Sequence, residues 1–340
     1  MKIAIVNDAP LAVEALRRVV VGAGHEVLWI AVNGEEGVRL AAAERPELIL
    51  MDLVMPVMDG VQCTRQIMAA SPCPIVVVTS TVAGAYEKVY EAMALGALDA
   101  VDTPTIGDPA SVERVVKKIT TIGRLLAPAV RSPVSQLTRA PTAPPVATIA
   151  QAPLLAIGAS TGGPRAVADV LAGIGPAFPA ALVIVQHVDL QFASGLARWL
   201  EEQSKWRVEL AEPGMRPRIG VALLAATEHH LVLTADGTLT YTPRPIEIPF
   251  RPSVDVFFKS AVAWKERAAA VLLTGMGKDG ARGMLGLRAA GWLTIAQDEA
   301  SSVVYGMPKA AVELKAATHV LALDAIAPVL TRHFRQPKRP

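Results

Sequence analysis

The sequence predicts an α/β protein with two domains, each built around a mostly parallel sheet that is covered by helices. Two observations lead to this prediction. Short apolar runs alternate with helix-period segments on both sides of residues 126–153, and this middle segment has neither a 2-residue nor a 3.6-residue apolar period. The length of 340 residues and the 52% hydrophobic content provide enough apolar surface for two separate cores.

The first domain is expected to cover residues 1–125 and to contain five β/α units, which gives a (βα)5 fold. Each unit begins with a short aliphatic run that fits a buried strand, and a segment with helical periodicity follows it. The predicted strands are IAIV (3–6), EVLWIA (26–31), LILM (48–51), IVVV (75–78) and AV (100–101).

A linker and a second domain follow. Residues 126–153 are crowded with proline, alanine, serine and threonine, which predicts a linker that is extended where the prolines cluster. Residues 154–332 then predict a doubly wound, mostly parallel α/β domain, in which an alternating pattern around Asp236-Gly237 predicts a β-hairpin over residues 229–242. Its predicted strands are LLAI (154–157), ALVIV (181–185), VALLA (221–225), AVLLT (270–274) and WLTIA (292–296), with helices such as 164–173 and 281–290.

Composition excludes several classes of protein. The 33 basic and 31 acidic side chains nearly cancel, and no long block of one charge indicates binding to nucleic acid or to a membrane. The N-terminus has no signal-peptide pattern, and no apolar run reaches the ~18 residues of a membrane span. Cys63 and Cys73 alone make neither a disulfide framework nor a cysteine metal site. We therefore expect a soluble, cytoplasmic protein.

Acidic side chains follow two predicted strands of the first domain. Asp8 follows the first strand, Asp52 ends the third and Thr79 ends the fourth, and functional groups gather at such carboxyl ends in parallel sheets. Two neighbouring carboxylates repel each other unless a hard cation such as Mg²⁺ neutralises them, and that cation can also orient a phosphoryl group. Taken singly, each aspartate is better explained as a helix N-cap.

Ser160 lies in GASTGG (158–163), which matches the pattern G-x-S-x-G between a predicted strand and a predicted helix. Small neighbours allow a sharp turn that exposes the hydroxyl, and backbone N–H groups at a helix start can stabilise an oxyanion. A dinucleotide loop is disfavoured, because Ser160 takes the place of a glycine that must let the backbone approach a pyrophosphate. A packing turn remains an alternative.

A nucleophilic serine requires a base and a group that orients the base. His187 follows the strand ALVIV, and it is the one histidine placed at the end of a strong strand signal. Asp279 lies in TGMGKDG after AVLLT and can accept a hydrogen bond from a ring N–H of His187. An N-cap role for the next helix explains the presence of this aspartate as well. The remaining histidines are expected in turns, in the hairpin or in the tail: His25, His229, His230, His319 and His333.

Five blocks of the second domain resemble the catalytic domain of chemotaxis-type protein-glutamate methylesterases, the CheB family. They are GASTGG, QHVD (186–189), RPSVDVFF (251–258), LLTGMGKDGARG and QDEASSVVYGMPKAA (297–311). The chain order serine, histidine, aspartate also differs from that of α/β-hydrolases.

The resemblance implies a hydrolase that removes γ-glutamyl methyl esters from methyl-accepting chemoreceptors and also deamidates receptor glutamines. Ser160 would be the nucleophile, His187 the base and Asp279 the orienting carboxylate. The backbone N–H groups of Thr161 and Met276 would form the oxyanion hole. No metal or cofactor is needed for this ester hydrolysis.

Residues 1–125, with DLVMPVMDG after the third strand, resemble a response-regulator receiver domain. The resemblance implies that a chemotaxis-type histidine kinase phosphorylates Asp52, that Thr79 contacts the phosphoryl group, and that Mg²⁺ binds Asp8, Asp52 and the carbonyl oxygen of Val54. Asn7 stands where receivers usually have a second acid, and Thr103 stands where they have a lysine. The unphosphorylated receiver is expected to lie against the catalytic crevice and to exclude the receptor.

The segments VNDAPLAVEALRR and GALDAVDTP further resemble the WspF-like subgroup of surface-sensing chemosensory systems. Two other classes stay open at this point. One is a non-catalytic response regulator that binds receptors or a kinase, and the other is a nucleotide-dependent oxidoreductase. A DNA-binding output domain is not predicted, because the second half lacks a basic recognition helix.

Overall fold

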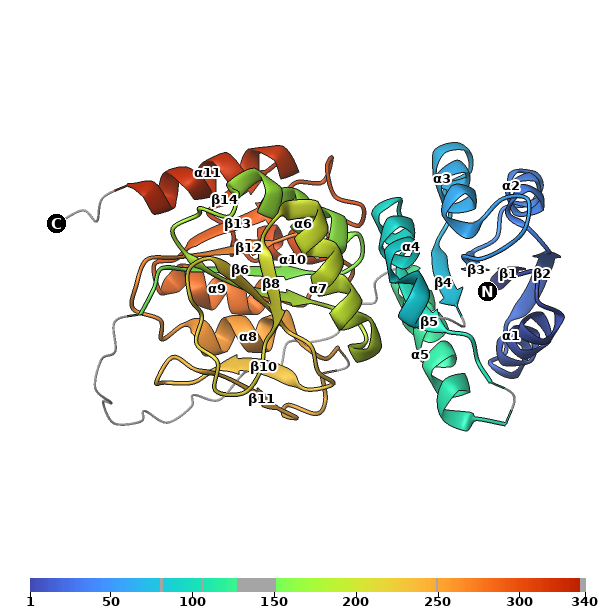
Figure 1. Ribbon diagram of the computed structural model, residues 1–340, viewed down its shortest axis with the longest axis horizontal. Coiled ribbons are helices and arrows are strands. Elements are labelled where there is room, and N and C mark those ends of the chain that lie inside the picture. The colour runs from blue at the N-terminus through green and yellow to red at the C-terminus, as the bar shows by residue number, and fades with distance from the viewer. Residues whose placement is uncertain (80–81, 106, 127–150, 249, 337–340) are drawn as a thin grey trace.

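The computed structural model describes residues 1–79, 82–105, 107–126, 151–248 and 250–336. It has two α/β lobes, each with its own parallel sheet (Figure 1). Most of the predicted linker, residues 127–150, lies outside the described part of the chain.

The N-terminal lobe contains a five-stranded parallel sheet in the order β2-β1-β3-β4-β5. Helices α1 and α5 share an apolar cluster with one face of this sheet, and α2, α3 and α4 pack on the other face. Its elements are β1 (Lys2–Val6), α1 (Pro10–Gly22), β2 (Glu26–Ala31), α2 (Gly34–Ala43), β3 (Leu48–Met51), α3 (Gly60–Ala70), β4 (Ile75–Thr79), α4 (Val82–Ala94), β5 (Asp99–Asp102) and α5 (Pro109–Leu126).

The C-terminal lobe contains a seven-stranded parallel sheet in the order β14-β13-β12-β6-β7-β9-β8, and a separate antiparallel hairpin, β10-β11. Its strands are β6 (Leu154–Ala159), β7 (Ala181–Gln186), β8 (Arg207–Leu210), β9 (Val221–Leu224), β10 (His230–Leu233), β11 (Leu239–Thr242), β12 (Ala268–Leu272), β13 (Leu293–Gln297) and β14 (His319–Leu321). Its helices are α6 (Gly163–Ile174), α7 (Leu190–Ser204), α8 (Val254–Ala261), α9 (Ala281–Ala289), α10 (Met307–Glu313) and α11 (Leu323–Arg335).

Alternating side chains of the buried strands divide the second lobe into layers. On β6, Leu155 and Ile157 join a cluster with α6, α7 and α11, whereas Leu154 and Ala156 join a cluster with α8, α9 and α10. This two-sided burial explains why the central strands are continuous apolar runs. The first strand of the lobe, β6, lies between β7 and β12, so the strand order reverses beside it, which is where α/β proteins bind ligands.

The α/β fold predicted from the sequence is present in both lobes, and each predicted strand has a counterpart. The apolar run at 270–274 begins two residues later than β12, which covers 268–272. Two edge strands, β8 and β14, were not predicted, because both are short and partly exposed and so lack a continuous apolar run. The expectation that His319 and His333 lie in turns or the tail was wrong: His319 begins β14, and His333 lies in α11.

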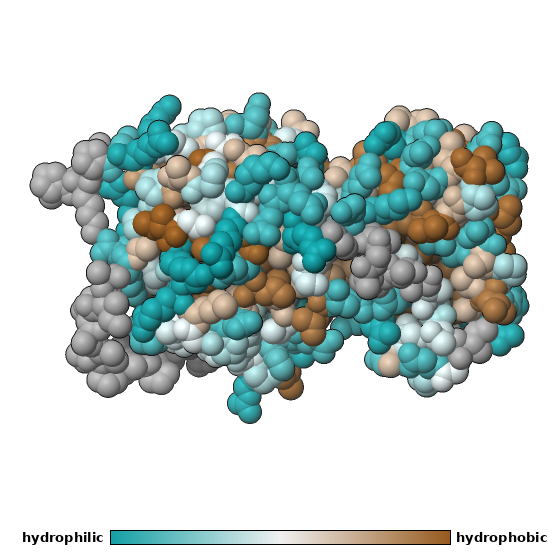
Figure 2. Space-filling view, viewed as in Figure 1, coloured by the Kyte–Doolittle hydropathy of each residue, from teal (hydrophilic) through white to brown (hydrophobic). Residues whose placement is uncertain are grey.

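The two lobes pack against each other through α4 and α5 on one side and the α7 region on the other (Figure 1). The Tyr90 hydroxyl of α4 donates a hydrogen bond to the Phe192 carbonyl of α7, and the Tyr90 ring lies 5.9 Å from the ring of Trp199. Figure 2 shows the two lobes as separate masses with a notch between them, and brown apolar patches on both. None of the helices that the structure describes is long and apolar enough to cross a membrane.

Candidate active site

Three adjacent strands of the second lobe bring Ser160, His187 and Asp279 to one edge of the sheet. Ser160 directly follows β6, His187 directly follows β7, and Asp279 lies in the loop after β12. Because β12, β6 and β7 are parallel neighbours, their carboxyl ends meet at the same edge. Residues that are far apart in the sequence therefore share one site.

The turn that carries Ser160 is fixed by its backbone. The Ser160 N–H donates to the Thr274 carbonyl at 3.1 Å, and the Ser160 carbonyl accepts from Gly163 N and from Gln186 Nε2, both at 2.8 Å. Gly162 has a φ of 72°, and a Cβ atom there would lie 2.6 Å from Cβ of Val303. A side chain at this position would be strained in the backbone and would clash, so the glycine is required for the strand-to-helix turn.

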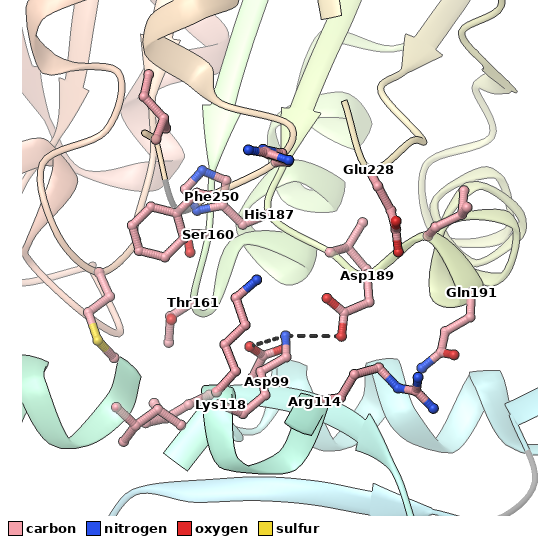
Figure 3. A pocket seen from close by; sticks show the side chains of 18 of the residues that line it. Asp99, Arg114, Lys118, Ser160, Thr161, His187, Asp189, Gln191, Glu228 and Phe250 are labelled. Atoms are coloured by element: carbon pink, nitrogen blue, oxygen red, sulfur yellow. Dashed lines mark hydrogen bonds and ion pairs between the residues drawn. The ribbon is translucent and has the colours of Figure 1, made fainter. Parts of the chain in front are cut away.

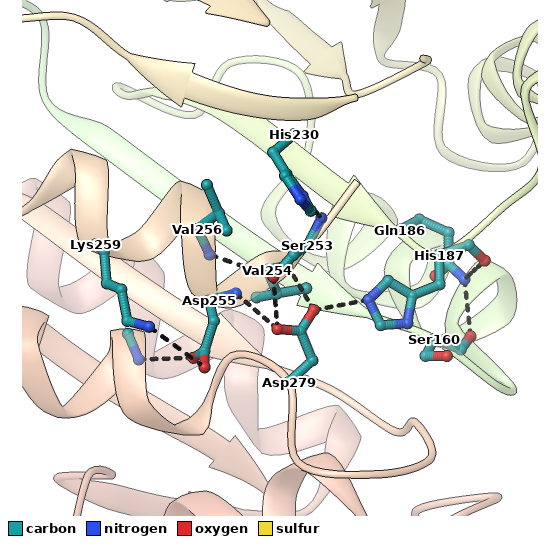
Figure 4. A network of polar contacts seen from close by, with 11 residues as sticks. Ser160, Gln186, His187, His230, Ser253, Val254, Asp255, Val256, Lys259 and Asp279 are labelled. Carbon is teal, nitrogen blue, oxygen red and sulfur yellow. Dashed lines mark hydrogen bonds and ion pairs between the residues drawn. The ribbon is translucent and has the colours of Figure 1, made fainter. Parts of the chain in front are cut away.

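The imidazole of His187 lies between Asp279 and Ser160 (Figure 4). Its Nε2 is 2.8 Å from Oδ2 of Asp279, and the two side chains are 11% and 7% exposed. The other ring nitrogen, Nδ1, is buried and has no hydrogen-bond partner among the described residues. If Nε2 carries the proton and donates a hydrogen bond to Asp279, Nδ1 keeps its lone pair and is the nitrogen that can take a proton from a serine hydroxyl.

Asp279 does not cap the helix that follows it, since the N-cap of α9 is Gly280. Its side chain instead faces the N-terminus of α8. Its carboxylate accepts hydrogen bonds from Ser253 Oγ at 2.8 Å, Val254 N at 2.7 Å and Asp255 N at 3.0 Å (Figure 4). Burial alone would raise the pKa of Asp279, but the bonds from His187 and Ser253 and from this helix start lower it to about 2. The carboxylate is thus ionised and held in place.

Thr161 and Met276, predicted as oxyanion donors, both line the cavity that contains Ser160. The Thr161 carbonyl accepts a hydrogen bond from Thr274 Oγ1 at 2.9 Å. In the part of the chain that the structure describes, neither the Thr161 nor the Met276 N–H donates to a backbone carbonyl.

A cavity of about 730 Å³ opens over these groups, and both lobes line it (Figure 3). From the second lobe it is lined by Ser160, His187, Glu228 and Phe250, and from the receiver-like lobe by the α5 side chains, among them Arg114 and Lys118. Lys118 Nζ lies 2.6 Å from Asp99 and 3.2 Å from Asp189, two residues beyond His187. An ion cluster between the lobes thus borders the candidate active site.

The structure also places the acidic residues of the first lobe. Asp52 follows β3, Asp8 follows β1, and Thr79 is the buried last residue of β4, the next strand. Neither acid caps a helix: the N-cap of α1 is Ala9, and Asp59 caps α3. Burial raises the pKa of Asp52, although bonds from the Leu53 and Val54 N–H groups oppose this, and the negative charge of Asp8 raises it further.

These residues fit the Mg²⁺ that the fold implies. Two carboxylates close enough to repel each other are stabilised by a divalent cation, which otherwise keeps several water ligands. The side-chain oxygen of Asn7, which stands where receivers have a second acid, accepts a hydrogen bond from Ala9 N at 2.8 Å. Asp8, Asp52 and the Val54 carbonyl therefore remain the candidate ligands. The described residues contain no cluster of three or more acidic, histidine or cysteine ligands.

The sequence did not single out three side chains that lie around His187 and Asp279. The Phe250 ring stacks on His187 with centroids 4.9 Å apart and planes 6° apart. Ser253 is fully buried and donates to Asp279, and His230 is fully buried beside Ser253. The block RPSVDVFF was a signal for Ser253, but nothing local distinguished His230 from its exposed neighbour His229.

The fold and the site define a two-domain protein, in which a receiver-type lobe precedes an α/β lobe with a serine, a histidine and a carboxylate at one sheet edge. Two family models match the chain: CheB methylesterase over residues 155–330, and response regulator receiver domain over residues 3–110. The chain therefore belongs to the CheB methylesterase family.

Relatives cover nearly the whole chain. A protein-glutamate methylesterase/protein-glutamine glutaminase of Burkholderia thailandensis is 53% identical over 337 residues, which are 96% of each chain. A protein of the same name from Pseudomonas syringae pv. syringae is 50% identical and covers 99% of this chain and 100% of its own. The crystal structure of the Thermotoga maritima CheB methylesterase catalytic domain matches with a TM-score of 0.51 and 34% identity, over 54% of this chain and 99% of that one.

Proposed function

We propose that this protein is a carboxylic ester hydrolase that removes γ-glutamyl methyl esters from methyl-accepting chemoreceptors. The observation that carries the proposal is the alignment of Ser160, His187 and Asp279 on three adjacent strand ends, with an ionised Asp279 held 2.8 Å from His187. The names of the full-length relatives supply the substrate, because each is called a protein-glutamate methylesterase/protein-glutamine glutaminase.

In the first step, the Ser160 oxygen attacks the γ-carbonyl carbon of the methylated glutamate, and His187 Nδ1 takes the hydroxyl proton. The carbonyl oxygen becomes negatively charged, and the N–H groups of Thr161 and Met276 stabilise it. When the tetrahedral intermediate breaks down, His187 returns the proton to the departing methoxide. Methanol leaves and an acyl-enzyme remains. Asp279 stabilises the imidazolium while it carries the proton.

In the second step, water attacks the acyl-enzyme. His187 accepts a proton from the water, the C–O bond to Ser160 breaks, and Ser160 regains its proton. The product is a free glutamate carboxylate. A glutamine side chain has a planar carboxamide carbon that would form the same kind of tetrahedral intermediate with Ser160, and its breakdown releases ammonia instead of methanol, which supports a second activity as a protein-glutamine glutaminase.

We propose that the receiver domain controls access to this site. Arg114, Lys118 and other α5 side chains form one wall of the cavity over Ser160, so the receiver domain takes up space on one side of the site that a receptor segment would have to approach. Phosphorylation of Asp52 by a chemotaxis-type histidine kinase would favour release of the receiver. In this reaction Mg²⁺ would be held by Asp8, Asp52 and the Val54 carbonyl, and Thr79 would contact the phosphoryl group. Mg²⁺ supplies charge neutralisation for this phosphoryl transfer.

The assignment to the WspF-like subgroup remains a prediction, which rests on the N-terminal sequence and on Asn7 and Thr103. It changes the pathway that supplies the receptor and the kinase, and not the reaction.

Methanol release from methylated receptors by the full-length protein tests the activity, with and without a small-molecule phosphodonor. We expect the phosphodonor to raise the rate, and Asp52→Asn to remove the increase.

Ser160→Ala should lower the rate by at least about 10³-fold, because the residual activity comes only from oxyanion stabilisation and binding. Receptor binding by Ser160→Ala should persist, which separates a hydrolase from a non-catalytic regulator.

A shortened protein that starts near Ala152 tests the inhibitory role of the receiver domain. We expect its rate of methanol release to exceed the basal rate of the full chain. Equal rates would remove the inhibitory role and leave the hydrolase in place.

A further inference from the structure

His230 is a buried polar side chain close to the candidate active site that the mechanism above does not use. It is the first residue of β10 and is 0% exposed, whereas the neighbouring His229 is exposed. Both of its ring nitrogens have partners. Nδ1 accepts a hydrogen bond from Ser253 N at 3.2 Å, and Nε2 lies 3.1 Å from the Pro245 carbonyl.

These two bonds determine the protonation of the ring. A backbone N–H can donate to Nδ1 only if Nδ1 has a free lone pair, so the proton must be on Nε2, which donates it to Pro245. Burial lowers the pKa of His230, which favours this neutral form. One imidazole thus holds the chain at two places, Pro245 and Ser253.

The bond to Ser253 leads directly to the acid of the triad. Ser253 is the N-cap of α8, its side chain accepts from Val256 N, and its hydroxyl donates to Oδ1 of Asp279 at 2.8 Å. Its position also sets the Val254 and Asp255 N–H groups that hold Asp279. Because His230 fixes the Ser253 amide, it acts on Asp279 through the start of α8 (Figure 4).

The bond to Pro245 acts on the cavity wall instead. Of the residues between Pro245 and Ser253, Ile246, Ile248, Phe250 and Arg251 line the cavity over Ser160. Arg251 donates to the Ile246 carbonyl at 2.8 Å, and Phe250 stacks on His187. A side chain that holds Pro245 therefore supports the apolar wall that receives the substrate.

We propose that His230 is a positioning residue with two separable effects: its Ser253 bond orients Asp279 for catalysis, and its Pro245 bond sets the substrate-binding wall. This proposal rests on the proposed methylesterase function. It predicts that the loss of one bond lowers kcat and that the loss of the other raises KM.

Two conservative substitutions separate the bonds in the full-length protein. In His230→Asn, the amide oxygen can accept from Ser253 N but the side chain is too short to reach Pro245. In His230→Gln, the amide nitrogen can donate to Pro245, but no acceptor remains at the Nδ1 position. We expect His230→Asn mainly to raise KM for methylated receptor, and His230→Gln mainly to lower kcat, each on the order of 10- to 100-fold.

A spectroscopic readout reports on the triad itself. The proton between His187 Nε2 and Asp279 should give a downfield proton resonance, and we expect His230→Gln to shift or broaden it while His230→Asn preserves it. His229→Ala is the matched control, and it should leave kcat, KM and the resonance unchanged. Thermal melting of each variant identifies any general loss of folding.

The outcomes distinguish this proposal from the proposed function. If wild-type protein releases no methanol, or Ser160→Ala releases as much, the hydrolase assignment fails. If the wild type is active and both His230 variants keep wild-type kcat, KM and His187 resonance, the positioning role is overturned. Equal and parallel losses in the two variants would also overturn it, because they would indicate a single structural effect.

Discussion

At the scale of single residues, Asp279 combines burial with full ionisation. A carboxyl group that is 7% exposed normally resists ionisation, yet its pKa is held at about 2 by His187 and by the donors at the start of α8. The carboxylate that contacts His187 is therefore ionised at neutral pH. This arrangement needs the helix start, because a lone ion pair with histidine would depend on the protonation of the imidazole.

The first prediction concerns the pH dependence of the free energy of unfolding. The pKa of Asp279 is about 2 in the folded protein, below its ordinary value of 3.8. The ionised carboxylate therefore stabilises the fold fully above the unfolded-state pKa, and this stabilisation is lost as the pH falls through the folded-state pKa. Asp279→Asn should therefore lower stability by about 2 kcal/mol at neutral pH. The difference from wild type should stay constant down to about pH 4 and shrink below it.

Urea denaturation at several pH values measures this difference, with Asp324→Asn, an exposed residue of α11, as the control. A difference that does not shrink under acid would show that Asp279 is not stabilised as a carboxylate.

At the scale of elements, the parallel strands were predictable because burial on both faces makes them continuous apolar runs. The same logic brought Ser160, His187 and Asp279 to one sheet edge, since each follows a predicted strand. Sequence patterns did not indicate β8 and β14, whose edge positions remove the apolar signal. They also did not indicate His230, because its role depends on a hydrogen bond to Ser253, which is 23 residues away.

The turn between β6 and α6 provides a prediction about glycine. Gly162 has a φ of 72°, and an added Cβ would lie 2.6 Å from Cβ of Val303. Gly24, which follows the C-cap of α1, has a φ of 78°, but an added Cβ there meets nothing within 4 Å. Gly24→Ala should cost about 1 kcal/mol of unfolding free energy, from backbone strain alone. Gly162→Ala should cost about 2–4 kcal/mol, because a clash adds to the strain.

Chemical denaturation of the two glycine variants compares these costs, and methanol release reports on the geometry of Ser160. We expect a larger loss of activity in Gly162→Ala. Equal stabilities and activities would mean that the contact with Val303 relaxes without cost.

At the scale of the whole molecule, the active-site cavity is shared between lobes that fold around separate sheets. Tyr90 and Trp199 continue one apolar cluster across the boundary, and Lys118 connects Asp99 of β5 with Asp189 beside the catalytic loop. Thr79 ends the strand that precedes α4, and α4 carries Tyr90. β4, which pairs with the strand before Asp52, thus precedes the helix that contacts the second lobe.

Lys118 offers the sharpest test of this coupling. Its ammonium lies between two carboxylates, so Lys118→Ala leaves Asp99 and Asp189 facing each other without the cation that holds them together. Removing one partner of a half-buried ion cluster should weaken docking of the receiver by on the order of 1–3 kcal/mol. Basal methanol release by the full chain should then rise about 10-fold, and a phosphodonor should add little.

Lys2→Ala, which removes an exposed charge at the start of β1, is the control. A basal rate equal to that of wild type, with a full response to the phosphodonor, would mean that this ion cluster does not hold the receiver over the active site.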